Sequence, residues 1–120
     1  MVVFLDTYAL FEIDKANPKY KGCGDEGVIT TVFNLVELHF VYLRRFGEHE
    51  AEAALRAYRK YAVPVGDDVI RSASQFKLTH LKKRMSFADC IGYAAAQLYG
   101  VPFVTGDYAF KNMPGVEFVQ

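Results

Sequence analysis

Val2-Val3-Phe4-Leu5-Asp6 is the stretch on which the interpretation of the fold rests, four apolar residues followed by an acid. A short, continuous apolar run is typical of a strand that is buried on both faces, as in a parallel sheet covered by helices. Val101 to Val104 is a second run of this kind, and Thr105-Gly106-Asp107 follows it. Open α/β sheets bind their ligands at the carboxyl ends of parallel strands. The two stretches therefore predict two acids at the ligand-binding edge of one sheet.

Helical patterns lie between these strands, recognised by the spacing of apolar residues and by capping signals. Ser86-Phe87-Ala88-Asp89 resembles a capping box at the start of one helix. The predicted helices run from Asp6 or Thr7 to about Asp14, from Thr31 to Gly47, from Glu48 to Tyr61, from Asp67 to about Leu81, and from Ser86 to Tyr99. The segments between them are predicted as a Gly-rich loop at Lys19 to Gly27, a brief strand or connector at Val63 to Val65, and a last strand at Val116 to Val119. Strands separated by helices imply parallel pairing with right-handed crossovers, so the predicted fold class is α/β.

The composition limits the classes of protein to which the chain can belong. A length of 120 residues suits one domain with one core, and we expect residues 1–120 to form it. The apolar content of 52% argues against a large disordered segment. No stretch approaches the roughly 20 apolar residues of a membrane span, and the N-terminus lacks a basic leader. We expect a soluble, cytoplasmic protein with no disulfide framework, because the two cysteines, Cys23 and Cys90, show no pairing or zinc-site spacing.

The charge balance excludes a protein that holds nucleic acid by bulk electrostatics. Fourteen basic and fourteen acidic residues give a formal net charge of zero, whereas such proteins are basic overall. Any contact with RNA must come from local patches. The candidates are Lys15, Lys19 and Lys21, Arg44-Arg45, and Lys82-Lys83-Arg84, although each is also typical of a solvated helix end.

Two further acids lie in predicted helices. Asp89 falls in the first turn of its helix, and Glu37 falls in the second turn of another, on the same side as Phe33 and Phe40. An unpaired buried charge is very unfavourable, and the sequence offers no obvious buried Lys or Arg as its partner. A hard divalent cation would serve instead, because Mg²⁺ and Mn²⁺ prefer carboxylate oxygens.

These residues carry a family resemblance. The motifs are Val3-Phe4-Leu5-Asp6-Thr7, Asn34-Leu35-Val36-Glu37-Leu38, Ser86-Phe87-Ala88-Asp89 and Val104-Thr105-Gly106-Asp107. Their order, and the intervals of 31, 52 and 18 positions between the acids, resemble those of PIN domains. Nearly the whole chain takes part, and its length is similar to that of the small, stand-alone, VapC-like toxins of toxin–antitoxin pairs. Each motif alone is weak, but four in order are fairly specific.

The resemblance implies a three-layer α/β/α domain with a central, mostly parallel sheet and helices on both faces. It implies that Asp6, Glu37, Asp89 and Asp107 hold Mg²⁺ or Mn²⁺ and cleave RNA by means of a metal-activated water. The hydroxyl groups that match the family pattern, and that we expect to hydrogen-bond the ligands, belong to Thr7, Ser86 and Thr105. It also implies a homodimer and an antitoxin partner. The aromatic residues Phe33, Phe40, Phe46, Tyr58 and Tyr61 supply apolar surface for such contacts.

The sequence departs from the family pattern at one place, directly after Asp107. Relatives often carry a further acid or polar residue after the position of Asp107, where this chain has Tyr108 and Ala109. A single bound ion is therefore expected, and a catalytically inactive PIN-fold module that binds RNA or protein is the alternative.

A receiver domain is disfavoured because Asp6 has no acidic partner before Thr7-Tyr8 and because Lys111 is followed by Asn112 and not by Pro. An Asp-x-Asp phosphatase is disfavoured because Tyr8 occupies the place of its second acid.

Each acid also has a structural interpretation. Asp89 can be a helix-start acid, and Asp6 and Asp107 can be cap or turn residues. Glu37 is the hardest to explain in this way, unless Arg44 reaches it when the helices pack.

Overall fold

Four short parallel strands form the centre of the structure, a computed structural model that describes residues 1–120. The strands are β1 (Val3–Leu5), β2 (Val28–Ile29), β3 (Phe103–Thr105) and β4 (Val116–Phe118), in the order β2-β1-β3-β4. The helices are α1 (Thr7–Asp14), α2 (Val32–Phe46), α3 (Glu48–Tyr58), α4 (Asp67–Thr79) and α5 (Phe87–Tyr99). Short 3₁₀ turns are η1 (Pro18–Tyr20), η2 (Arg59–Tyr61), η3 (Leu81–Lys83) and η4 (Tyr108–Phe110). This α/β architecture with a parallel sheet confirms the predicted fold class.

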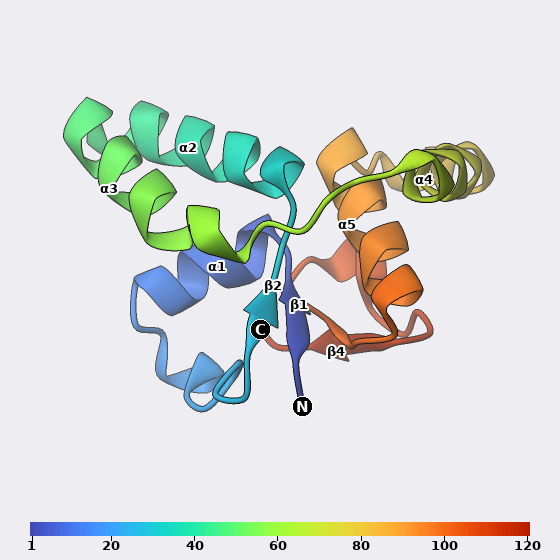
Figure 1. Cartoon of the computed structure of the whole chain (residues 1–120), viewed down its shortest axis with the longest axis horizontal. Helices are drawn as coiled ribbons and strands as arrows, with labels where there is room; N and C mark the ends of the chain where they lie inside the picture. Colours follow the sequence, from blue (N-terminus) through green and yellow to red (C-terminus); the bar gives the residue numbers. More distant parts are fainter.

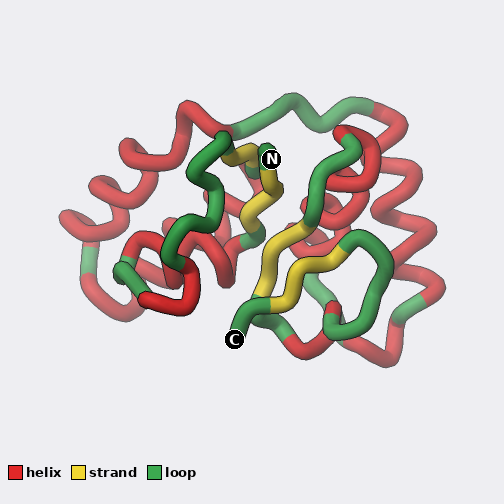
Figure 2. The backbone as a smooth tube through the Cα atoms, turned by 90° about the horizontal axis from the view of Figure 1, so that it is seen from below, coloured by secondary structure: helices red, strands yellow, loops and turns green.

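Helices cover both faces of the sheet. Successive side chains of each strand point to opposite faces and pack into two separate hydrophobic cores. Phe4 and Phe103 point to the face covered by α4 and α5, where their rings stack with centroids 5.5 Å apart. Leu5 and Val104 point to the opposite face, covered by α1, α2 and α3. Figure 1 shows the two helical groups on either side of β1 and β2, and Figure 2 shows the strands between them. The arrangement is the three-layer one that the resemblance implied.

Caps fix the ends of the helices that matter for the site. The Asp6 carboxylate accepts a hydrogen bond from the Ala9 N–H at 2.8 Å and begins α1. Thr31 caps α2, and Ser86 with Asp89 forms a reciprocal capping box at α5, as the sequence predicts. The chain therefore turns sharply after β1 and after β3, which leaves Asp6 and Asp107 at the carboxyl edge of the sheet.

Some element boundaries differ from the predictions. The strand β2 was not predicted, because two residues at the end of a Gly-rich loop carry too little pattern for one. The segment at 63–65 is a connector, joined to Thr30 by a single parallel bridge at Ala62, since Pro64 has no N–H to continue a ladder. The predicted helix from Glu48 ends at Tyr58 and continues as η2, while Gly66 caps α4. No helix is long and apolar enough to cross a membrane.

Candidate functional site

The four acids approach one another at the carboxyl edge of the sheet. Asp6 directly follows β1, and Asp107 follows the neighbouring strand β3 after Gly106. Glu37 lies on α2 and Asp89 on α5, two helices that contact each other. Burial is the main cause of the raised pKa of Asp6 and of Asp89; negative charge on Asp89 and Asp107 raises the pKa of Asp6 further, and charge on Glu37 and Asp107 does the same for Asp89. The fold therefore brings each of the four predicted residues within electrostatic reach of at least one other, with Asp89 close to Asp6, Glu37 and Asp107.

Asp6 is the most deeply buried of the four acids, with an exposed fraction of 1%. Burial raises the pKa of Asp6 to about 7, against the hydrogen bonds from Thr105 and from the Ala9 N–H, which lower it. No Lys, Arg or His forms an ion pair with its carboxylate, or with that of any other acid of the group. Asp6 is thus a buried carboxyl group that has hydrogen-bond donors but no positive charge to balance it.

Asp89 and Asp107 both have local structural roles. Burial raises the pKa of Asp89 to about 6, and one of its oxygens accepts from the Ser86 N–H at 2.9 Å. One oxygen of Asp107 accepts from the Ala109 N–H at 2.9 Å and caps η4. The cap interpretation is correct for both residues. This role uses one oxygen of each carboxylate, and the second oxygen accepts no hydrogen bond from a backbone N–H.

Glu37 is held by a chain of polar side chains that runs into the core. The Thr7 hydroxyl donates to Glu37 Oε1 at 2.9 Å, and Asn34 Nδ2 donates to the Thr7 oxygen at 3.3 Å. Asn34 in turn accepts from the Thr31 hydroxyl at 2.7 Å. Glu37 thus needs no Arg44, contrary to the structural interpretation of the sequence. Its place on α2 is set by a polar network rather than by an ion pair.

Asn34 belongs to one of the four motifs but was not among the predicted site residues. Its side chain is fully buried, and it connects the cap of α2 to the hydroxyl that bonds Glu37. The signal was available: Asn34 is the one polar residue in the run from Val32 to Val36, three positions before an acid. Buried amides are nearly always hydrogen-bonded, so its position alone pointed to a network.

The three predicted hydroxyl groups each contact an acid, in different ways. Thr105 donates to Asp6 Oδ2 at 2.5 Å and accepts from the Asp107 N–H at 3.0 Å, so it links two of the acids. Thr7 bonds the Glu37 carboxylate. The Ser86 hydroxyl accepts from the Asp89 N–H as the helix cap, and its proximity also lowers the pKa of the Asp89 carboxyl group. Thr105 and Thr7 orient carboxylates directly, whereas Ser86 orients the turn of helix that carries one.

The four acids have the chemistry that a hard cation prefers, although their carboxylates do not converge on one point. Glu37, Asp89 and Asp107 each keep one carboxylate oxygen that accepts no hydrogen bond from a backbone N–H. All the candidate ligands are oxygen, the preference of Mg²⁺ and Mn²⁺. No group of three or more His, Cys, Asp and Glu side chains, however, is arranged to hold a metal ion. Closure around an ion therefore requires rotation of the partly buried carboxylates of Glu37, Asp89 and Asp107.

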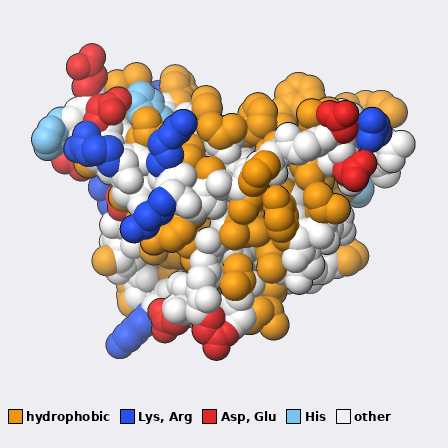
Figure 3. All heavy atoms as spheres, viewed as in Figure 1, with side chains coloured by type: hydrophobic (Ala, Val, Ile, Leu, Met, Phe, Trp, Pro, Cys, Tyr) orange, Lys and Arg blue, Asp and Glu red, His pale blue; other side chains and the backbone are white.

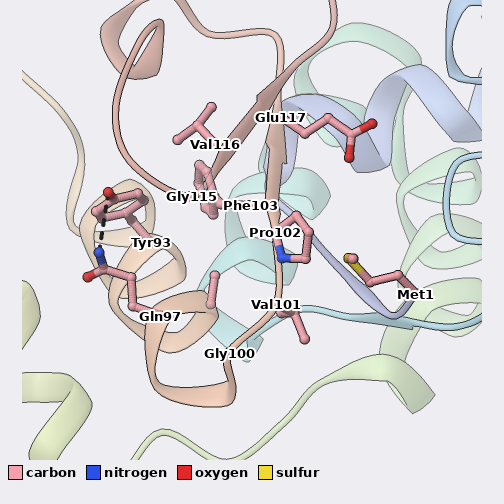
Figure 4. Close-up of a pocket in the computed structure, with 11 residues that line it drawn as sticks. Met1, Tyr93, Gln97, Gly100, Val101, Pro102, Phe103, Gly115, Val116 and Glu117 are labelled. Carbon is pink, nitrogen blue, oxygen red and sulfur yellow. Dashed lines mark hydrogen bonds between the residues drawn. The ribbon is translucent and has the colours of Figure 1, made fainter.

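The largest cavity lies at the opposite edge of the sheet and takes no part in this site. It measures about 770 Å³ and lies beside Phe103 and Val116, which begin β3 and β4. Figure 4 shows Gln97 donating to the Tyr93 hydroxyl at 3.3 Å, with Glu117 as the one acid among the lining residues. Cavity size therefore does not locate the chemistry of this molecule.

Comparisons with known proteins agree with this fold. The family model described as PIN domain matches residues 3–116. The structure is similar to that of VapC20 from Mycobacterium tuberculosis, described as a sarcin-ricin loop cleaving toxin, with a TM-score of 0.80 and 21% identity over all of both chains.

Two complexes are also similar. VapBC2 from Rickettsia felis, bound to a DNA fragment from its promoter, has a TM-score of 0.74 and 14% identity over all of both chains. DNA-bound VapBC from Salmonella typhimurium has a TM-score of 0.72 and 16% identity over 98% of this chain and 97% of that one. No curated protein matches the chain.

Proposed function

Because this chain belongs to the PIN domain family, we propose that it is a metal-dependent ribonuclease that hydrolyses the phosphodiester backbone of RNA. The observation that carries the proposal is the group of four acids at one sheet edge without any cationic partner. A structural group of buried acids would carry its own Lys or Arg, because unbalanced charge destabilises the fold. Four acids that lack one are suited to an ion that comes from solution.

In this proposal Asp6, Glu37, Asp89 and Asp107 hold Mg²⁺ or Mn²⁺. The bound ion supplies a water of lowered pKa and offsets charge on the scissile phosphate, so that cleavage leaves a 5′-phosphate and a 3′-hydroxyl. Thr105 keeps Asp6 Oδ2 in place, and Thr7 does the same for Glu37. Asp6, whose pKa is raised to about 7, would have to be ionised to hold the cation, so binding would release a proton near neutral pH.

The test is calorimetric titration of Mn²⁺ into the wild type and into an Asp6→Asn/Asp107→Asn double variant. We expect saturable binding by the wild type alone, and cleavage of RNA that stops when EDTA is added. The matched control is Asp67→Asn/Asp68→Asn, which removes two acids that are 84% and 82% exposed on α4, away from the site. Equal Mn²⁺ binding by all three proteins, or none by the wild type, would exclude the acids as a metal site.

An inactive binding module is the second candidate. Tyr108 and Ala109 stand where relatives carry a further acid, and the four carboxylates do not converge. Such a module would bind RNA or protein with the same affinity in Mn²⁺ and in EDTA. The calorimetric result therefore separates the two functions without knowledge of the natural RNA.

The proposed partners are a second copy of the chain and an antitoxin, with this chain as the toxin of a type II pair in the cytoplasm. The similar complexes from Rickettsia felis and Salmonella typhimurium are VapBC complexes, and another similar structure, from Mycobacterium tuberculosis, is described as a member of the VapBC family of toxin-antitoxin systems. Apolar side chains are prominent along the upper edge of the molecule, over α2 (Figure 3), where Val36 is 63% exposed and Phe40 is 58% exposed. Light scattering should give a dimer that Phe40→Glu disrupts. Leu98→Glu is the control, since Leu98 is equally exposed on α5.

A further inference from the structure

The loop that leads from β3 to Asp107 is bonded to the two residues that follow β4. We call residues 105–107 the Asp107 loop. The Val119 N–H donates to the Thr105 carbonyl at 2.8 Å, and the Gln120 side-chain amide donates to the Gly106 carbonyl at 3.1 Å. Figure 2 shows the stretch that follows β4, up to the end marked C. Both carbonyl groups just before Asp107 therefore accept hydrogen bonds from one short piece of chain.

A buried tyrosine fixes that piece of chain in turn. The Tyr20 hydroxyl donates to the Val119 carbonyl at 2.7 Å, across 99 positions of sequence, and Tyr20 is only 3% exposed. Lys19 Nζ donates to the Gln120 carbonyl at 2.8 Å. Tyr20 and Lys19 belong to η1, which follows α1. Residues 119 and 120 are thus bonded to η1 on one side and to the Asp107 loop on the other.

Two of the candidate metal ligands depend on the placement of the Asp107 loop. The Thr105 hydroxyl donates to Asp6 Oδ2 and accepts from the Asp107 N–H at 3.0 Å. Gly106, between them, has no side chain that could restrict its own backbone. A shift of this loop would therefore move Asp107 and release a hydrogen bond to Asp6 at the same time.

We propose that Tyr20 and Gln120 are positioning residues of the metal site, which keep Thr105 and Asp107 in place relative to Asp6. They act through the backbone of the Asp107 loop and take no part in the bond-breaking step. The inference rests on the proposed ribonuclease function, because it takes the acids as metal ligands. Neither residue belongs to the four motifs from which the acids were predicted.

This support matters because the carboxylates must converge before they can hold an ion. With a fixed loop, Asp107 reaches the ion by rotation of its side chain alone. With a loose loop, binding must also order the backbone, and that ordering lowers the affinity. Loss of either hydrogen bond should therefore weaken Mn²⁺ binding although every ligand is still present.

The test combines calorimetric titration of Mn²⁺ with urea unfolding of the metal-free variants. Tyr20→Phe removes only the hydroxyl group, and Gln120→Met removes the amide donor at nearly constant side-chain length. We expect each variant to bind Mn²⁺ about 10-fold more weakly than the wild type, the lower end of the effect of groups that support metal ligands.

Two matched controls remove the same chemical groups away from the Asp107 loop. Tyr58→Phe removes a donor to Asp14, which lies at the end of α1 opposite to Asp6. Gln97→Met removes a donor to the Tyr93 hydroxyl at the other edge of the sheet. Both controls should bind Mn²⁺ like the wild type, whatever their effect on the free energy of unfolding.

Hydrogen exchange in EDTA gives a measurement that does not depend on the metal. The Asp107 N–H, bonded to Thr105, reports the order of the loop, whereas the Ala9 N–H is bonded to Asp6 outside it. We expect exchange of the Asp107 N–H to become about 2- to 10-fold faster in Tyr20→Phe and Gln120→Met, with that of Ala9 unchanged. A general loss of stability would accelerate both.

The outcomes separate this inference from the proposed function. If the wild type binds Mn²⁺ and Tyr20→Phe and Gln120→Met bind it equally well, or leave exchange of the Asp107 N–H unchanged, the positioning role is wrong and the ribonuclease stands. If Tyr58→Phe weakens Mn²⁺ binding as much as Tyr20→Phe does, the effect is one of general stability and the inference also fails. If the wild type does not bind Mn²⁺, both proposals are overturned.

Discussion

Replacement of Asp6 by Asn should make the metal-free protein more stable at neutral pH while it abolishes cleavage. Each pKa unit corresponds to about 1.4 kcal/mol. The rise in the pKa of Asp6 from an ordinary 3.8 to about 7 therefore means that the ionised side chain destabilises the fold by about 4 kcal/mol at pH 8. Asn keeps an acceptor for the Ala9 N–H and carries no charge. It disturbs the Thr105 hydroxyl, which offsets about 1–3 kcal/mol of the gain.

The pH dependence separates this effect from a packing change. A raised pKa in the folded state means that the folded protein binds more protons than the unfolded chain between pH 4 and pH 7. The wild type without metal should therefore lose stability as the pH rises through this range, and Asp89, with its pKa of about 6, adds to the loss. The stabilisation by Asp6→Asn should be roughly 2–3 kcal/mol larger at pH 8 than at pH 5.

The assay is urea unfolding of both proteins at pH 5 and pH 8, in EDTA and in Mn²⁺. Mn²⁺ at about one hundred times its dissociation constant should stabilise the wild type by about 2.7 kcal/mol and leave the variant unchanged. Asp68→Asn, an exposed acid on α4, is the matched control for net charge. A variant that is less stable than the wild type in EDTA by the same amount at both pH values would refute the argument and identify Asp6 as a structural cap.

Three further predictions concern the framework of the site. Gly106→Ala should destabilise the protein by about 1–3 kcal/mol in urea, since its Cβ would lie 2.2 Å from Tyr8 Cε1 and 2.6 Å from a backbone oxygen; Gly66→Ala, which meets nothing within 4 Å, should not. Asn34→Ala should lower stability by about 1–3 kcal/mol and Mn²⁺ affinity about 10- to 100-fold in calorimetry, because it frees the Thr7 hydroxyl that bonds Glu37. Residues 1–120 should unfold in one transition seen alike by circular dichroism and tyrosine fluorescence, and two separate transitions would contradict a single domain.

The site imposes a stability penalty that the rest of the fold must offset. Clustered acids repel one another in the absence of a cation, and burial of Asp6 strengthens the effect. Two apolar cores, one on each face of the sheet, provide the opposing free energy. Conditions that weaken these cores should therefore unfold the metal-free protein before they unfold the metal-bound protein.

Much of the fold could be predicted because its signals are local. The apolar runs that become β1 and β3, the capping box at Ser86 and Asp89, and the stop at Gly100 are each legible within a few residues. The strand β2 could not be predicted, since Val28 and Ile29 become a strand only by pairing with β1. The end of α3 at Tyr58 was missed for a similar reason, because η2 continues the same helical pattern.

The sequence by itself determined the order of the elements other than β2 and the parallel pairing of the sheet, and it predicted the four acids and the hydroxyls of Thr7 and Thr105 as site residues. Only the tertiary structure decided that Asp6 is fully buried while Glu37 is partly exposed, and that Asn34 links Thr31 to Thr7. It also decided that the Phe87 and Tyr108 rings face solvent. Periodicity and capping act between residues near in the chain, whereas burial and electrostatic coupling depend on neighbours that only folding brings together.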